Sequence, residues 1–185
     1  MQKIFYIFIL FFSLVTTNTF AQNNIMILKL TYGDVEIELY PEKAPNHVKR
    51  FKELAKSGKY DGVVFHRVIE GFMAQTGDVK YGNKNQYYPE LVGQGGSSLP
   101  DLRAEFSKKK FLAGTMGMAR SSNPDSANSQ FFIMFKDAPH LNNKYTIVGK
   151  LVVGMDVLLR IKRGNIKVNG LVENPDYMEK VFIEN

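Results

Sequence analysis

Residues 65–78 have the sequence Phe-His-Arg-Val-Ile-Glu-Gly-Phe-Met-Ala-Gln-Thr-Gly-Asp, in which a Glu-Gly pair separates two short apolar runs. This arrangement predicts two strands joined by a tight turn. Alternate side chains of a strand share a face, so Phe65 and Arg67 would point the same way, as would Met73 and Gln75. An arginine, an amide, a thioether and aromatic rings this close together are unusual for a core hairpin. A plain hairpin with its arginine in solvent is the alternative interpretation.

A strand pair and a helix are predicted on the N-terminal side of this stretch. Residues 25–30 and 35–39 flank a Tyr-Gly-Asp turn signal, and residues 35–39 alternate between aliphatic side chains and glutamates. The alternation predicts one buried and one solvated face. After Pro41 and Pro45, apolar residues recur at helical spacing up to Ala55, and a Ser-Gly pair then provides a stop signal.

The C-terminal side contains one long polar stretch and several strand-like runs. Residues 77–101 lack periodicity, which predicts a loop. Its Gly-Gln-Gly-Gly segment lacks the lysine of a phosphate-binding loop. Further strands are predicted within residues 111–119, 129–135, 146–153 and 178–183, and a helix within 155–161.

These elements predict a mainly β fold. Seven or eight short strands and two helices, without an internal repeat, are typical of a closed eight-stranded antiparallel barrel capped by two α-helices. About 160 residues are enough for one domain with a sizeable core, and we assign residues 22–185 to it.

The N-terminus predicts an export signal. A lysine at position 3 precedes an apolar run over residues 4–15, and Thr19-Phe20-Ala21 has small residues at its first and third positions. We therefore predict a signal peptide over residues 1–21 and a periplasmic or secreted protein without stable membrane insertion. The apolar run is short for a membrane span, which needs about 20 residues, although an uncleaved anchor is an alternative.

Composition excludes several kinds of chemistry. The chain has no cysteine, and therefore no disulfide, thiol nucleophile or thiolate metal site. Its net charge is +6, but the densest basic run is Lys108-Lys109-Lys110, so we expect a solvated basic surface and no nucleic-acid partner. The three histidines have no metal-ligand spacing, and no Gly-x-Ser-x-Gly motif is present. An enzyme with this sequence would use no metal, cofactor or covalent intermediate.

Three motifs together resemble one family. Residues 65–78, the Ser-Gln-Phe-Phe-Ile run at 129–133 and the His-Leu-Asn-Asn-Lys-Tyr-Thr-Ile-Val-Gly-Lys run at 140–150 are similar to the corresponding segments of cyclophilins, and they occur in the same order. Cyclophilins are barrel-fold peptidyl-prolyl cis–trans isomerases. The resemblance extends over about residues 25–183 and implies the same barrel with two capping helices.

The resemblance also assigns roles to residues. Arg67 is at the position of the family's catalytic arginine, and Phe72 and Gln75 complete the implied catalytic set, with Gln75 holding the substrate carbonyl. The side chains implied to receive the proline ring are Phe72, Met73, Phe132 and Leu141. Further residues implied to bind substrate are His66, Ala119, Arg120, Gln130, His140 and Tyr145.

The implied reaction is rotation about X-Pro peptide bonds. Amide resonance opposes this rotation with a barrier of ~18–20 kcal/mol, and the uncatalysed step takes roughly 10–100 s. In the twisted transition state the nitrogen lone pair becomes a hydrogen-bond acceptor, and a donor at Arg67 would bind it only there. No proton transfer is required. We expect proline-containing polypeptides as substrates, a role in the folding of exported proteins, and a monomer.

Two departures from the family and two alternative functions stay open at this point. His140 stands where many eukaryotic members have tryptophan, which implies weak cyclosporin binding, and Arg120 stands where many have asparagine. A proline-binding chaperone without turnover and a structural barrel with a degenerate site are the alternatives.

Overall fold

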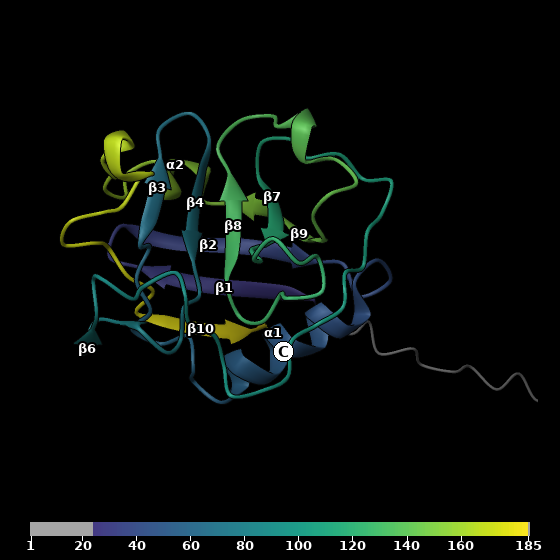
Figure 1. The fold of residues 1–185 in the computed structure, drawn as a ribbon, viewed down its shortest axis with the longest axis horizontal. Coiled ribbons are helices and arrows are strands. Elements are labelled where there is room, and N and C mark those ends of the chain that lie inside the picture. Colours follow the sequence, from purple (N-terminus) through teal and green to yellow (C-terminus); the bar gives the residue numbers. More distant parts are fainter. Residues whose placement is uncertain (1–23, 185) are drawn as a thin grey trace, which may run out of the picture.

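The computed structural model describes residues 24–184, which form one antiparallel eight-stranded sheet in the order β10-β1-β2-β9-β7-β8-β4-β3 (Figure 1). The strands are β1 (Ile25–Leu30), β2 (Gly33–Leu39), β3 (Arg67–Ile69), β4 (Met73–Thr76), β7 (Thr115–Met118), β8 (Phe131–Met134), β9 (Ile147–Val153) and β10 (Lys180–Ile183). The predicted mainly β fold is confirmed. The signal peptide predicted for residues 1–21 lies outside the described residues.

The sheet curls so that β3, β4 and β8 run across β1 and β2 (Figure 1). Its edge strands β3 and β10 do not pair with each other. Residues 170–178 fill the seam between them. In this seam the Val68 amide donates to the Gly170 carbonyl (2.9 Å), and the Val172 amide donates to the His66 carbonyl (3.0 Å). The barrel is therefore closed by irregular chain at this point.

Strand alternation places the core. In β2, Val35, Ile37 and Leu39 are buried, whereas Glu36 and Glu38 are at least partly accessible, as their alternation predicts. Phe65 differs from its prediction. It lies in the barrel core, away from the face of Arg67, because β3 begins only at Arg67 and the strict alternation does not extend back to residue 65.

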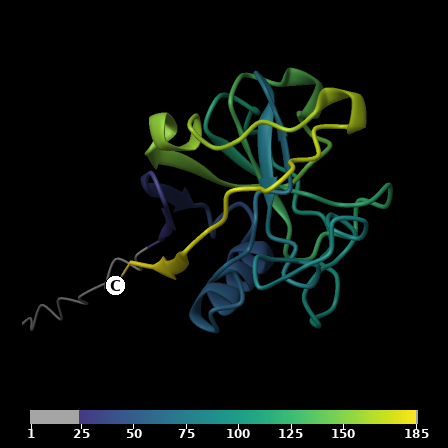
Figure 2. The ribbon, with the colours of Figure 1, turned by 90° about the vertical axis from the view of Figure 1, so that its left-hand side faces the viewer.

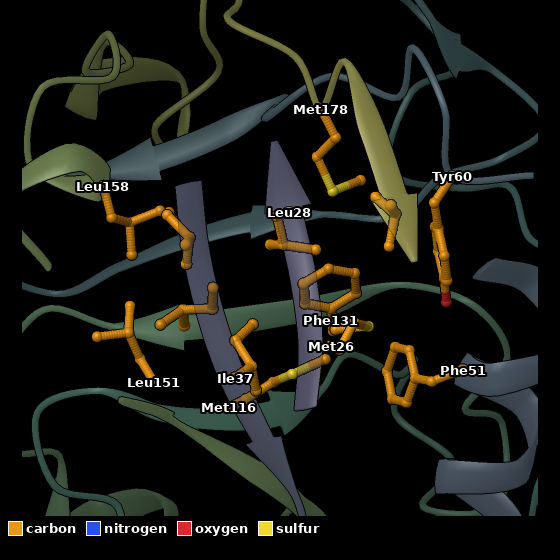
Figure 3. Packing of buried hydrophobic residues seen from close by; sticks show 14 of the residues in the cluster. Met26, Leu28, Ile37, Phe51, Tyr60, Met116, Phe131, Leu151, Leu158 and Met178 are labelled. Carbon is orange, nitrogen blue, oxygen red and sulfur yellow. The ribbon is translucent and has the colours of Figure 1, made fainter. Parts of the chain in front are cut away.

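Aromatic rings fill one end of the core (Figure 3). Phe131 makes edge contacts with Phe51 (ring centroids 5.3 Å apart) and with Tyr60 (5.8 Å). The Tyr60 hydroxyl donates to the Ser129 carbonyl (2.9 Å), so this buried polar atom is satisfied. Burying each such large side chain contributes about 1.5–3 kcal/mol.

Two α-helices lie at different ends of the barrel (Figures 1 and 2). Helix α1 (Pro45–Lys56) begins at its proline, ends before the Ser-Gly stop and buries the apolar face that its spacing predicts. Helix α2 (Met155–Leu158) is shorter than the predicted 155–161. The Arg160 amide donates to the carbonyl three residues earlier, that of Val157 (3.0 Å), which ends the α-helical hydrogen-bond pattern. Within residues 24–184, no helix has the length and apolar character needed to cross a membrane.

One buried carboxylate organises the long polar loop after β4. Asp78 has no exposed surface, and its two oxygens accept four backbone hydrogen bonds of 2.8 to 3.1 Å. The donors are the N–H groups of Lys80, Tyr81, Gly93 and Gly95. The loop also contains a short hairpin, β5 (Gly82–Asn83) with β6 (Gln86–Tyr87), which the sequence did not predict.

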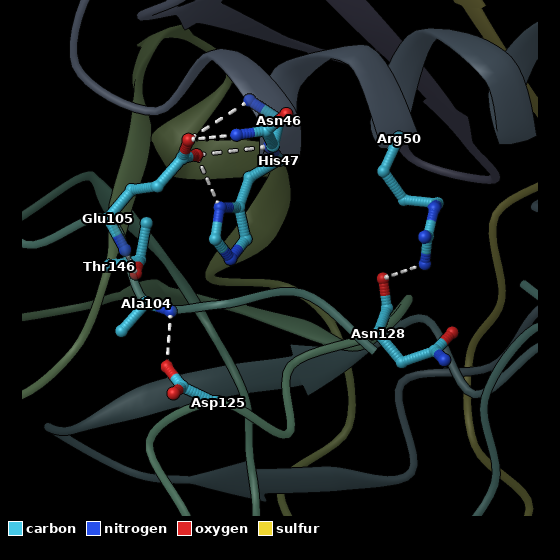
Figure 4. Close-up of polar contacts among 8 residues, drawn as sticks. All are labelled: Asn46, His47, Arg50, Ala104, Glu105, Asp125, Asn128 and Thr146. Atoms are coloured by element: carbon cyan, nitrogen blue, oxygen red, sulfur yellow. Dashed lines mark hydrogen bonds and ion pairs between the residues drawn. The ribbon is translucent and has the colours of Figure 1, made fainter. Parts of the chain in front are cut away.

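A second polar cluster ties the start of α1 to the chain before β7 (Figure 4). His47, which is fully buried, contacts Glu105 Oε2 through Nδ1 at 2.6 Å. Burial lowers the pKa of His47 despite the opposing effect of Glu105. Burial alone would raise the pKa of Glu105, but hydrogen bonds from His47 and Asn46 lower it. A neutral imidazole therefore donates to a carboxylate at the helix N-terminus, where negative charge is favourable.

Candidate active site

A hollow of about 290 Å³ opens beside β3, β4, β7 and β8. It is lined by Arg67, Phe72, Met73, Gln75, Ala119, Arg120, Phe132, Leu141 and Tyr145. Nine of the twelve residues that the sequence singled out are thus brought together from segments far apart in the chain. The other three, His66, Gln130 and His140, lie around this hollow.

The apolar part of the hollow is built on Phe132. Its ring stacks on Phe111 (centroids 5.8 Å apart, planes at 20°) and meets Tyr145 edge-on (5.8 Å, 85°). Gly117 in β7 leaves the room for this stack. A Cβ at Gly117 would lie 2.6 Å from Phe132 Cζ and 2.7 Å from Phe111 Cε1, which is closer than real contacts. The ring positions therefore depend on a glycine beneath them.

Arg67 forms the polar edge of the hollow. Its Nε donates to the backbone carbonyl of Asn169 (2.9 Å), and Nη2 donates to the Asn169 side-chain oxygen (3.0 Å). Its Nη1 donates to Gln75 Oε1 (3.1 Å), as the direct pairing of residues 67 and 75 across β3 and β4 allows. Burial lowers the pKa of Arg67, but an arginine remains charged in proteins. The guanidinium is held in one orientation.

A chain of amides continues from Arg67. Gln75 accepts from Arg67 and donates through Nε2 to Gln130 Oε1 (3.0 Å), and Gln130 in turn donates to the Gly95 carbonyl (2.8 Å). In each glutamine the side-chain oxygen accepts one hydrogen bond and the side-chain nitrogen donates one. Because Arg67 can only donate, it sets the direction of every hydrogen bond in this chain. Gln130 thus supports the wall of the hollow through Gln75.

The rim carries three further predicted residues. The Arg120 guanidinium lies over the Tyr145 ring (4.3 Å to its centroid). Exposed His140 stacks on Phe72 (ring centroids 5.8 Å apart, planes at 27°) and so covers the outer side of that ring.

His66 lies behind Arg67. It is 2% exposed and lines a neighbouring hollow with Val168 and Asn169, which shares Arg67 and Gln75 with the first. Burial lowers its pKa to about 4, although Asp78 has an opposing effect. His66 is therefore neutral at pH 7, and it lies outside the hollow that Phe132 lines.

A second hollow, of about 370 Å³, lies beyond Arg120. It is lined by Gln75, Gly93, Gln94, Gly95, Ala119, Arg120, Ser121, Ser126, Asn128 and Gln130. Three of these residues, Gln75, Ala119 and Arg120, also line the first hollow. The two hollows form one groove, with an apolar half and a polar half.

Sequence reasoning missed two residues that position this site, Asn169 and Gly117. The Asn-Gly pair at 169–170 is a turn signal, and Asn169 does adopt a left-handed conformation (φ 57°). Nothing in the sequence connects that turn with Arg67, however. Within residues 24–184, no three acidic, histidine or cysteine side chains gather as a metal site requires.

The family model described as "Cyclophilin type peptidyl-prolyl cis-trans isomerase/CLD" matches residues 25–183. A probable peptidyl-prolyl cis-trans isomerase of Brucella suis is 57% identical over 170 residues, covering 91% of this chain and 87% of the relative. A peptidyl-prolyl cis-trans isomerase of Acinetobacter baylyi is 36% identical over 158 residues, covering 82% and 79%.

Solved structures are similar too. A Cryptosporidium parvum cyclophilin type peptidyl-prolyl cis-trans isomerase, crystallised in the presence of the dipeptide Ala-Pro, has a TM-score of 0.73 and 29% identity. The match covers 87% of this chain and 99% of that one. The cyclophilin AquaCyp293 from Hirschia baltica has a TM-score of 0.72 and 26% identity, covering 87% and 74%.

Proposed function

Because this chain belongs to the cyclophilin family and is a peptidyl-prolyl cis–trans isomerase, we propose that it assists the folding of exported proteins, with Arg67 as its catalytic residue. The proposal for export is supported by residues 1–21, whose charged, apolar and small residues follow the order of a signal peptide. Slow X-Pro isomerisation limits the folding of many chains, so an isomerase in the export compartment would act on a rate-limiting step.

The observation that carries the mechanism is a fixed guanidinium at the edge of an apolar hollow. The rings of Phe72 and Phe132 would hold a proline ring in this hollow. Arg67 has five N–H donors; its bonds to Asn169 and Gln75 use three and a contact with Met73 Sδ (3.7 Å) uses a fourth, so one donor remains for substrate. During rotation the proline nitrogen loses its resonance and becomes an acceptor, which Arg67 then binds.

This hydrogen bond accelerates the reaction because it forms only in the transition state. In the planar ground state the nitrogen lone pair is delocalised and offers no acceptor. Gln75 would hold the carbonyl half of the peptide bond while the other half turns. Lowering the barrier by about 7 kcal/mol would give about five decades of rate, since each ~1.4 kcal/mol is tenfold.

Two observations support a monomer acting on peptides. The nine residues that line the first hollow already supply both its apolar surface and its polar donors, so the site needs no residue from a second copy. The structurally similar Cryptosporidium protein was crystallised with Ala-Pro, a peptide that ends in proline. Sedimentation at micromolar concentration, with the mass of a single copy of the chain from Gln22 onward expected, tests the monomer.

The decisive experiment compares isomerisation rates of short X-Pro peptides for the wild type and Arg67→Ala. We expect the variant to lose most of the acceleration, and equal rates would refute the role of Arg67. Export is tested separately, by determining the N-terminus of the protein recovered from the cell envelope or medium. We expect it to begin at Gln22.

A further inference from the structure

We propose that this isomerase favours client segments that carry a carboxylate one or two residues before the proline, and that Arg120 binds this carboxylate. The inference rests on the proposed function in one respect, because it assumes that the X-Pro segment of the substrate binds in the groove. It adds the chemistry of the neighbouring residue, which that function leaves open.

The charge of the groove is the first observation. The residues that line its two hollows include two arginines, Arg67 and Arg120, and no aspartate or glutamate. The nearby carboxylates, Asp78 behind Gly93 and Gly95 and the aspartates Asp101 and Asp125 on adjacent loops, line neither hollow. The groove is therefore positive without an acidic side chain of its own lining it.

The setting of Arg120 is the second observation. Its Nη1 donates to the Ser121 carbonyl (2.8 Å), its Nη2 donates to the Lys144 carbonyl (2.9 Å), and its plane rests on Tyr145. Neutral carbonyls fix the position of the guanidinium but leave its charge uncompensated. Among residues 24–184 it forms no ion pair, and its buried Nε has no hydrogen-bond acceptor. It is a preorganised cation without a counter-ion.

The place of Arg120 decides which client residue it would meet. It lines both hollows, as does Gln75, which in the proposed function holds the carbonyl of the residue before proline. With the proline ring over Phe132, the side chains of the one or two client residues before the proline would therefore lie beside Arg120, near the polar hollow. A carboxylate there would gain a charge-assisted hydrogen bond, which planar guanidinium groups form well.

The expected preference is modest, because Arg120 is only half-buried and solvent screens the pair. At about 20 mM salt we expect kcat/KM to be about fivefold higher for a Glu peptide than for its Gln counterpart, and the ratio to fall toward one at about 0.5 M salt. The test uses two matched pairs, Glu or Gln immediately before proline and Glu or Gln one residue earlier, in an otherwise identical sequence.

Three variants assign the preference to Arg120. Arg120→Gln should bring the Glu-to-Gln ratio to about one, whereas Arg120→Lys should keep part of it because the charge stays. Arg160→Gln is the control, since Arg160 also rests on a tyrosine ring, Tyr32 at 4.6 Å, but lines neither hollow. It removes the same charge from the protein and should keep the wild-type ratio.

Peptide affinities measured with the Arg67→Ala protein give the same ratio without turnover. The proposal would be overturned by a Glu-to-Gln ratio near one in both the wild-type rates and the Arg67→Ala affinities. It would also be overturned by a preference for Glu that survives Arg120→Gln. Failure of the proposed function gives a different result: rates on the neutral peptides would then be no higher than without enzyme, whatever the affinity ratio.

Discussion

The guanidinium of Arg67 donates hydrogen bonds to both oxygens of Asn169, the backbone carbonyl at 2.9 Å and the side-chain oxygen at 3.0 Å. The two residues are 102 positions apart in the sequence. Asn169 can present both because it adopts the left-handed conformation that asparagine tolerates. Gln75 holds the guanidinium from the other side, through Nη1. The cation therefore does not need to be ordered when a substrate arrives, and this lowers the entropic cost of reaching the transition state.

Replacing Arg67 by alanine should reduce kcat/KM for X-Pro peptides by about 100- to 1,000-fold, the usual effect of removing a donor that acts in the transition state. Arg67→Lys should recover a small part, because a lysine has the charge but not the planar fork. The measurement is a peptide isomerisation assay, with thermal unfolding to show that both variants remain folded. Arg160→Ala is the control and should behave as wild type.

Asn169→Gly should lower kcat about tenfold with little change in KM, because glycine keeps the left-handed backbone and the carbonyl but removes one charge-assisted bond to Arg67. Asn169→Asp, which restores an oxygen, should recover most of the rate. Steady-state kinetics on one peptide separates the two parameters. A loss confined to KM would contradict a positioning role for Asn169.

Gly117→Ala should destabilise the fold by about 1–3 kcal/mol and raise KM, since the new methyl group displaces the stacked rings of Phe111 and Phe132. Urea denaturation measures the first effect and peptide kinetics the second. An alanine variant with wild-type stability and KM would show that the rings do not depend on this glycine.

The stability of the protein should fall as the pH is lowered from about 6.5 to about 4, in part because of His66. Its pKa is about 4 when folded and near 6.5 when unfolded, so the unfolded chain binds the proton first. The loss from this residue amounts to about 3 kcal/mol across that window. His47, whose pKa burial also lowers, adds a loss of the same sign as the pH falls below its unfolded value.

Urea denaturation between pH 4 and pH 7 measures this dependence. His66→Gln should flatten the pH profile without abolishing it, because His47 still titrates. The matched control is His140→Gln, which replaces an exposed histidine on the rim and should leave the profile steep. An unchanged slope in His66→Gln would show that another group is responsible.

The elements that the sequence predicted well are those whose signal is local. The alternation in β2 and the proline-to-glycine span of α1 each depend on residues within one or two turns of chain, and both were confirmed. The facing of Phe65 was predicted wrongly, because a period of two holds only inside a strand and β3 begins two residues later.

The site itself needed more than local signals. Arg67, Gln75 and Phe132 were identified through a family resemblance, and the structure places them around one hollow. The contact of Arg67 with Asn169 could not be predicted, since an asparagine before a glycine has the same local signature in any turn. Gly117 falls inside the predicted strand region 111–119, but the need for a glycine there depends on the packing of Phe132, which comes from another strand.

The seam between β3 and β10 also determines when the enzyme can become active. A chain synthesised from its N-terminus presents β3 and Arg67 about a hundred residues before the segment that bonds to them, which also carries Asn169. Pairings of such long sequence separation form late and slowly. Arg67 therefore lacks its Asn169 partner until residues 169–172 have been synthesised and have docked against β3, and isomerase activity should appear only after that docking.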